Sequence, residues 1–141
     1  FTNTYLDQEN TIEVEISDIT GSGKTSGKVT LRPIVPKLVF YKKDPLLGTL
    51  WGDALSDGHI VSKDGDIIVL EPYFFSPKNI NSSGLSFTWK INDEKITTPN
   101  PKNVISIKPE GGKSGAALIN VLVDNTKTLF QYAEKQIRIQ F

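Results

Sequence analysis

Apolar and polar residues alternate with a period of two along most of this chain. The clearest segments are TIEVEIS (11–17), KVTLR (28–32), LSFTWKIN (85–92), ALINVLVD (117–124) and QIRIQF (136–141). A strand sends successive side chains to opposite faces, so this pattern places one set in a core and the other in solvent. The chain is therefore predicted to consist of half-buried β-strands.

Three less regular segments are further strand candidates: KLVFYK (37–42), DIIVLEPYFF (66–75) and NVISIKP (103–109). Pro72 limits the second, because proline cannot donate a hydrogen bond to a sheet, so that strand ends, bulges or lies at an edge there. A bulge after Pro72 would let both Phe74 and Phe75 point into the core.

Helical signals are few. The segment 44–55 holds one short turn at most, because Pro45, Gly48 and Gly52 all disfavour a helix. The segment 128–136 is interpreted as the arm of a long hairpin, since a strand follows it at once. Short strands separated by Gly, Asn, Asp and Pro are typical of a β-sandwich, so the predicted fold is all-β, an immunoglobulin-like antiparallel β-sandwich.

Two segments share one plan of strand, polar turn and strand: IEVEISD to KVTLRP (12–33) and LINVLVD to KQIRIQF (118–141). The simplest explanation is that both are closing hairpins of successive modules. Residues 1–35 would then be the C-terminal hairpin of a preceding module plus a Pro-rich linker, and residues 36–141 one sandwich of about a hundred residues. The alternative is that the first hairpin adds strands to the same sandwich. The start at Phe1 also suggests a piece of a longer or processed chain.

Composition narrows the function. Lys and Arg number 16 and Asp and Glu number 16, so no basic surface for nucleic acid is expected. No apolar run approaches the roughly 20 residues that span a bilayer, so direct membrane insertion is not expected. Cysteine is absent and His59 is the one histidine, which disfavours thiol chemistry, Cys-ligated zinc and most Ser–His–Asp arrangements.

The stretch TGSGKT (20–25) resembles a phosphate-binding loop, which reads G-x-x-x-x-G-K-[ST] between a strand and a helix. Asp18 stands where the first glycine is needed, and its carboxylate would repel phosphate. A β-branched strand and two prolines follow, so no helix can supply its N-terminal amides. The stretch is predicted to be a turn between antiparallel strands, with no nucleotide or other cofactor.

The segment 52–66 contains Asp53, Asp57, Asp64 and Asp66, but their spacing does not fit a calcium loop and suits turns instead. His59, in the same segment, is expected to be a solvated loop residue without a catalytic partner. No catalytic or metal-binding residues are predicted, so the chain is not expected to be an enzyme.

Seven aromatic residues could face either a core or a ligand: Tyr41, Trp51, Tyr73, Phe74, Phe75, Phe130 and Tyr132. Most are expected in the core. Trp51 lies in a Gly-flanked segment predicted to be a loop, where it is either an exposed anchor or a lid over one end of the sandwich. Trp51 and Tyr73 are the candidate contacts for a sugar ring or a protein partner.

The motif FTWKIND (87–93) and the VLVD strand (121–124) resemble bacterial immunoglobulin-like and PKD-type modules that lack cysteine. The segments 36–48 and 71–76 also resemble the last such segment of surface proteins from candidate-phylum bacteria. The resemblance implies that Trp89 packs across the sandwich. It also implies a structural or adhesive module, extracellular or at the cell surface, with any signal or anchor outside this chain.

The implied partners are neighbouring modules of the same polypeptide and protein or polysaccharide at the cell surface. Two other functions stay open. One is a carbohydrate-binding module of a secreted enzyme, with Trp51 and Tyr73 stacking on sugar. The other is a subunit of an extracellular filament, in which the first strand pairs with a neighbouring chain's sheet edge.

Overall fold

The computed structural model describes residues 9–32, 34–109 and 114–141, and every regular element in them is a β-strand. The chain divides into two compact units, Phe1–Val35 and Pro36–Phe141. The all-β prediction is confirmed, and the two units are described separately below.

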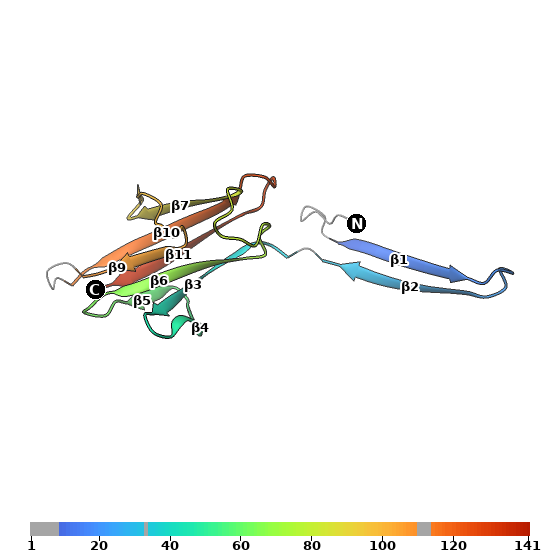
Figure 1. The fold of residues 1–141 in the computed structure, drawn as a ribbon, viewed down its shortest axis with the longest axis horizontal. Helices are drawn as coiled ribbons and strands as arrows, with labels where there is room; N and C mark the ends of the chain where they lie inside the picture. The colour runs from blue at the N-terminus through green and yellow to red at the C-terminus, as the bar shows by residue number, and fades with distance from the viewer. Residues whose placement is uncertain (1–8, 33, 110–113) are drawn as a thin grey trace. The chain divides into compact units, whose positions relative to one another are not determined.

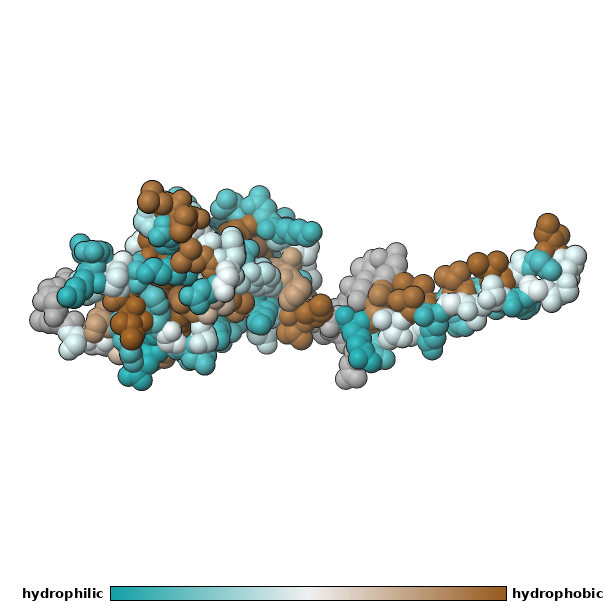
Figure 2. Space-filling model, turned by 90° about the horizontal axis from the view of Figure 1, so that it is seen from below, coloured by the Kyte–Doolittle hydropathy of each residue, from teal (hydrophilic) through white to brown (hydrophobic). Residues whose placement is uncertain are grey.

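The first unit contains one antiparallel hairpin, β1 (Asn10–Ser17) and β2 (Lys24–Leu31), which forms a two-stranded sheet of its own (Figure 1). Ile12 pairs with Val29 across the ladder, so their side chains share one face. Figure 2 shows this face as a hydrophobic row and the opposite face as hydrophilic. The strict alternation of the sequence therefore produces a hairpin with two chemically distinct faces.

The turn of this hairpin is the TGSGKT stretch, and Asp18 organises it. The Asp18 N–H donates to the Gly23 carbonyl at 3.0 Å, and the Ser22 N–H donates to Asp18 Oδ1 at 3.0 Å. In a phosphate-binding loop, backbone N–H groups point at the phosphate. Here the Ser22 N–H points at the Asp18 carboxylate instead. The predicted turn is present.

The second unit consists of two sheets. One has the order β4 (Gly48–Leu55), β3 (Lys37–Asp44), β6 (Asp66–Tyr73) and β9 (Val104–Ile107). The other has the order β5 (Gly58–Ile60), β11 (Tyr132–Gln140), β10 (Ala116–Asn125), β7 (Leu85–Ile91) and β8 (Glu94–Lys95). The pairings are antiparallel except that of β5 with β11, which is parallel, so the sandwich is not purely antiparallel.

The strand order is that of an immunoglobulin-like sandwich. In chain order β3, β6, β7, β9, β10 and β11 take the places of strands A, B, C, E, F and G. Strand β6 pairs with β9 in one sheet, while β7 pairs with β10 in the other. Among these six strands, the chain therefore crosses between the sheets after β6, returns before β9 and crosses again after β9.

Trp89 lies at the centre of the core with 0% of its surface exposed. It pairs with Val121 on β10, and its indole N–H donates to the Lys102 carbonyl at 2.9 Å. The inward side chains of both sheets surround it, among them Phe40, Ile68, Leu70, Ile119 and Ile137. The indole thus fills the space between the sheets while its one polar atom is paired.

Two local predictions were wrong. Residues 48–55 form strand β4, whereas the Gly-flanked part of this segment was predicted to be a loop; the one short turn allowed within 44–55 lies at residues 45–47. The Asp44 carboxylate accepts the N–H groups of Leu46 and Leu47 at 2.8 and 2.9 Å, and Gly48 has a φ of 78°, which together reverse the chain into a hairpin. The motif Asp-x-x-x-Gly was a usable signal for this turn.

The second error concerns the two phenylalanines after β6. Phe75 is buried at 8% exposure, but Phe74 is 54% exposed and has a φ of 64°. The left-handed backbone at Phe74 turns the chain out of the strand, so only the second ring enters the core.

Replacing Trp89 with alanine is expected to lower the unfolding free energy by about 3–5 kcal/mol, because a large cavity remains between the sheets. Urea denaturation followed by circular dichroism measures this. The neighbouring Lys90→Ala change serves as the control, since Lys90 is exposed and its removal should shift the free energy by about 0.5 kcal/mol or less. Equal effects of the two changes would contradict the assigned core.

Candidate functional site

The two predicted contact residues, Trp51 and Tyr73, meet through a third aromatic residue, Tyr41. The Tyr41 and Tyr73 hydroxyl groups lie 2.9 Å apart. The Trp51 ring contacts the Tyr41 ring edge-on, with 5.2 Å between centroids and 64° between planes. These three residues are called the aromatic cluster below.

The pleat of the strands places this cluster on the outer face of the β4–β3–β6–β9 sheet. Phe40 and Leu70 point into the core, and alternation therefore turns Tyr41 and Tyr73 to the other face. Tyr41 is only 7% exposed because Trp51 and Tyr73 contact it, whereas Trp51 is 58% exposed. Tyr41 forms the base of the cluster and Trp51 its accessible ring.

Trp51 does not lie in the predicted loop. It lies in β4, an edge strand that pairs with β3 through a register shift between Tyr41 and Lys43. This irregularity interrupts the period-two pattern, so the sequence pattern pointed to a loop. Trp51 lies in the irregular part of β4, between the paired positions Thr49 and Ala54, and its contact with Tyr41 sets the orientation of its ring.

The cluster offers uncharged aromatic surface beside one carboxylate. The hydrogen bond with Tyr41, together with burial, raises the pKa of Tyr73 to about 12, so the Tyr73 phenol stays protonated at neutral pH. Glu71 alternates onto the same face, and burial raises the pKa of its carboxyl. Aromatic faces of this kind stack on sugar rings or pack against apolar side chains, and the hydroxyl groups form hydrogen bonds.

Phe74 extends the aromatic surface at one end. Its ring centroid lies 6.3 Å from that of Tyr73, and its side chain is largely exposed. Phe130 and Tyr132, also expected in the core, are 53% and 56% exposed. Sequence reasoning overestimated aromatic burial because the aliphatic inward faces already fill the space around Trp89.

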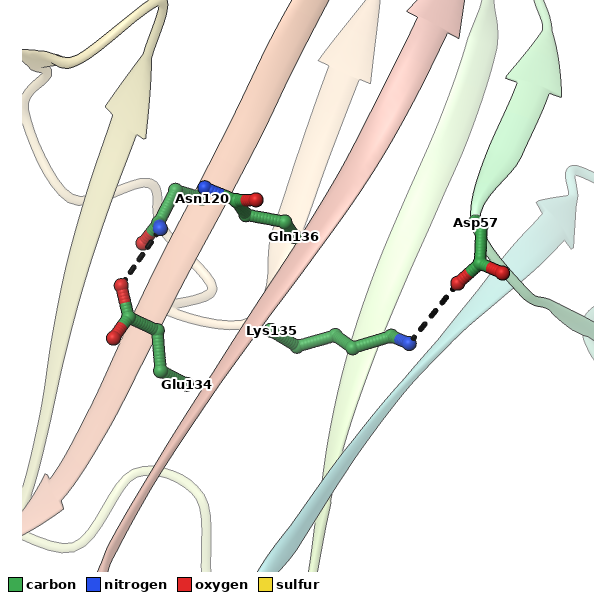
Figure 3. A pocket seen from close by; sticks show the side chains of 5 residues that line it. All are labelled: Asp57, Asn120, Glu134, Lys135 and Gln136. Atoms are coloured by element: carbon green, nitrogen blue, oxygen red, sulfur yellow. Dashed lines mark hydrogen bonds and ion pairs between the residues drawn. The ribbon is translucent and has the colours of Figure 1, made fainter.

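A polar depression of about 490 Å³ is lined by Asp57, Asn120, Glu134, Lys135 and Gln136. Figure 3 shows two separate pairs in it: the Asn120 amide donates to Glu134 at 2.7 Å, and Lys135 lies 3.6 Å from Asp57. Because these four groups are satisfied by one another and do not converge on one point, the depression has the character of ordinary polar surface.

Asp66 organises a second polar group, at the start of β6. Its side chain is 3% exposed and contacts Lys42 Nζ at 2.8 Å. It also accepts hydrogen bonds from His59 Nε2–H at 2.7 Å and from the Ser62 N–H at 3.0 Å. The prediction of a solvated His59 without a partner was wrong, since its ring is 12% exposed and belongs to strand β5.

Burial raises the pKa of the Asp66 carboxyl, but the hydrogen bonds from Lys42, Ser62 and His59 outweigh burial and hold the pKa well below its usual range. The carboxylate is therefore charged in the folded protein and joins β3, β5 and β6 at one point. Its role is structural, and the motif S-x-x-G-D around Gly65, whose φ is 92°, was the available signal for this turn.

Within the described ranges, no group of three or more His, Asp or Glu side chains is arranged to hold a metal ion. Nor is there, in the part of the chain that the structure describes, a helix long and apolar enough to cross a membrane.

Comparison of the chain with protein-family models, with curated proteins and with solved structures found no match. The resemblance to immunoglobulin-like and PKD-type surface modules therefore stays a prediction. The geometry of the site is the remaining basis for a functional proposal.

Acid is expected to destabilise the sandwich through Asp66. Because the folded-state pKa lies below the unfolded value, the contribution of Asp66 is fully present above about pH 5 and is lost as the pH falls toward the folded-state pKa. Asp66→Asn should lower the unfolding free energy at pH 7 by about 1–3 kcal/mol and flatten its dependence on pH between about 5 and 2.

Urea denaturation at a series of pH values measures both effects. Asp57→Asn is the matched control, because the Asp57 side chain is 95% exposed and its ion pair with Lys135 is long. A pH dependence that is the same in both variants would remove the role assigned to Asp66.

Proposed function

We propose that this chain is a non-catalytic structural or adhesive module of a larger bacterial cell-surface or secreted protein. The observation that carries the proposal is the self-contained core of Pro36–Phe141, closed around Trp89, in a chain whose first hairpin forms a separate sheet. A unit that closes its own core leaves its outer faces free to contact other molecules.

The adhesive part of the proposal rests on the aromatic cluster. Trp51 is held at a sheet edge by Tyr41, so binding to its exposed ring costs little side-chain entropy. Trp and Tyr are the side chains that most often dominate protein interfaces. Neighbouring modules, proteins and polysaccharides of the cell surface are the partners for which such a surface is suited.

Modularity is tested by removing residues 1–35. Residues 36–141 are expected to unfold cooperatively, at the same urea midpoint as the full chain, and to sediment as a monomer, because their core strands all lie within that range. Aggregation or a non-cooperative transition of the shortened chain would show that the first hairpin belongs to the same domain.

A carbohydrate-binding module is the second candidate, and the exposed Trp51 ring beside the Tyr73 hydroxyl favours it. If the full chain binds a glycan on an array, Trp51→Ala should weaken that binding at least tenfold, which corresponds to ~1.4 kcal/mol. Tyr132→Ala is the control, since Tyr132 is similarly exposed but lies on the other sheet. Absence of glycan binding, or equal losses in both variants, would eliminate this candidate.

A further inference from the structure

The hairpin of the first unit exposes a continuous apolar face. Ile12, Val14, Ile16 and Val29 are 37%, 55%, 63% and 58% exposed, and the pairing of Ile12 with Val29 places all four on the same side (Figure 2). An isolated two-stranded hairpin is marginally stable in water. An apolar face of this kind is therefore one that another element is expected to cover.

The opposite face of the hairpin is built for solvent. Glu13 pairs with Lys28 across the ladder, and Lys24 forms an ion pair with Glu15 at 3.0 Å. The charged pairs on one face and the aliphatic side chains on the other determine which face of the hairpin points to solvent. Only the aliphatic face is suited to burial.

The same arrangement occurs, fully buried, in β10 and β11 of the second unit. Eight consecutive cross-strand pairs correspond in the two hairpins. In the first they run from Asn10 paired with Leu31 to Ser17 paired with Lys24. In the second they run from Ala117 paired with Ile139 to Asp124 paired with Tyr132. The inward residues of the second hairpin are exposed by 2% or less: Ile119, Val121, Val123, Ile137 and Ile139. Their counterparts are Ile12, Val14, Ile16, Val29 and Leu31.

The two turns provide a second, independent correspondence. The Asn125 N–H donates to the Gln131 carbonyl at 2.9 Å, as that of Asp18 does to Gly23 at 3.0 Å. Asn125 Oδ1 accepts the Lys127 N–H at 3.0 Å, and Asp18 Oδ1 accepts the Ser22 N–H at the same distance. Each hairpin thus has an Asx side chain where its first strand ends: Asp18 directly follows β1, and Asn125 is the last residue of β10.

We propose that β1 and β2 are the F–G hairpin of another immunoglobulin-like unit, and that their apolar face docks against a sheet like β4–β3–β6–β9. The sheet comes from another segment of the same polypeptide, so this inference rests on the modular function proposed above. In the second unit, that sheet meets β10 and β11 with aliphatic and aromatic side chains such as Phe40, Ile68 and Leu70. The occupant is therefore an apolar sheet face with a complementary twist.

A second copy of this chain is a poorer occupant. Its β4–β3–β6–β9 sheet is already covered by its own β10 and β11, with Ile68 and Leu70 both at 0% exposure. The apolar face that such a copy exposes in the described part of the hairpin is only the equivalent two-stranded one. Docking of two hairpins would bury less surface than docking on a four-stranded sheet.

The test exchanges the strands within the full 141-residue chain. Residues 117–124 are replaced by the sequence of 10–17, and residues 132–139 by that of 24–31, while the native turn is kept. The change Trp51→Phe is included so that fluorescence reports Trp89 alone. This chimera is expected to unfold cooperatively with a blue-shifted Trp89 emission, because the same positions are apolar in both hairpins.

The control chimera uses residues 11–18 and 23–30 at the same places. It preserves the pairing but turns Glu13 and Glu15 toward the core, and it is expected to lose the cooperative transition and the blue shift. If the first chimera, with residues 10–17 and 24–31, is as unfolded as this control, the inference is wrong. The modular proposal would still stand if residues 36–141 fold alone, so the two failures are distinguishable.

A second measurement addresses the occupant. The unaltered chain is expected to sediment as a monomer at micromolar concentrations. If a dimer forms instead, the variants Val14→Lys, on the apolar face, and Glu13→Lys, on the polar face, show whether the apolar face holds it. The contradicting result is a dimer that Val14→Lys abolishes and Glu13→Lys retains. Such a dimer would show that a second copy covers the apolar face and would overturn the assignment to a segment of the same polypeptide.

Discussion

The burial of Trp89 between the two sheets is the constraint on which the rest of Pro36–Phe141 depends. A fully buried indole requires apolar side chains from both sheets and a partner for its N–H, which the Lys102 carbonyl supplies. This requirement keeps β7 beside β10 and places β3 and β6 opposite them. Because the core is closed in this way, the outer faces of the sheets do not need to pack against another element, and the aromatic cluster lies on one of them.

The periphery of the sandwich is held by polar groups. Asp66 is nearly buried, and a buried carboxylate is tolerated only when donors surround it. Lys42, His59 and Ser62 supply those donors from segments on either side of β4. Through His59, this one charged residue connects β5 of one sheet to β3 and β6 of the other, and it makes the stability of the unit sensitive to acid.

The sequence predicted the strands with regular alternation well and the irregular ones poorly. The segments 85–92 and 117–124 were assigned to strands with the correct faces, because the pleat is a local property of the backbone. Strand β4 was missed because its register shift breaks the alternation. Phe74 was misplaced because its left-handed backbone cannot be inferred from the identity of a phenylalanine.

The candidate site divides in the same way. By itself, the sequence determined the regularly alternating strands, their inward faces, the turn at TGSGKT and the amphipathic character of the first hairpin, since each follows from neighbouring residues. Only the tertiary structure decided that Tyr41 joins Trp51 to Tyr73 and that His59 contacts Asp66. The order of strands in the sheets brings Tyr41 and Tyr73 together. That order depends on packing between residues that are distant in the chain, and local periodicity carries no information about such packing.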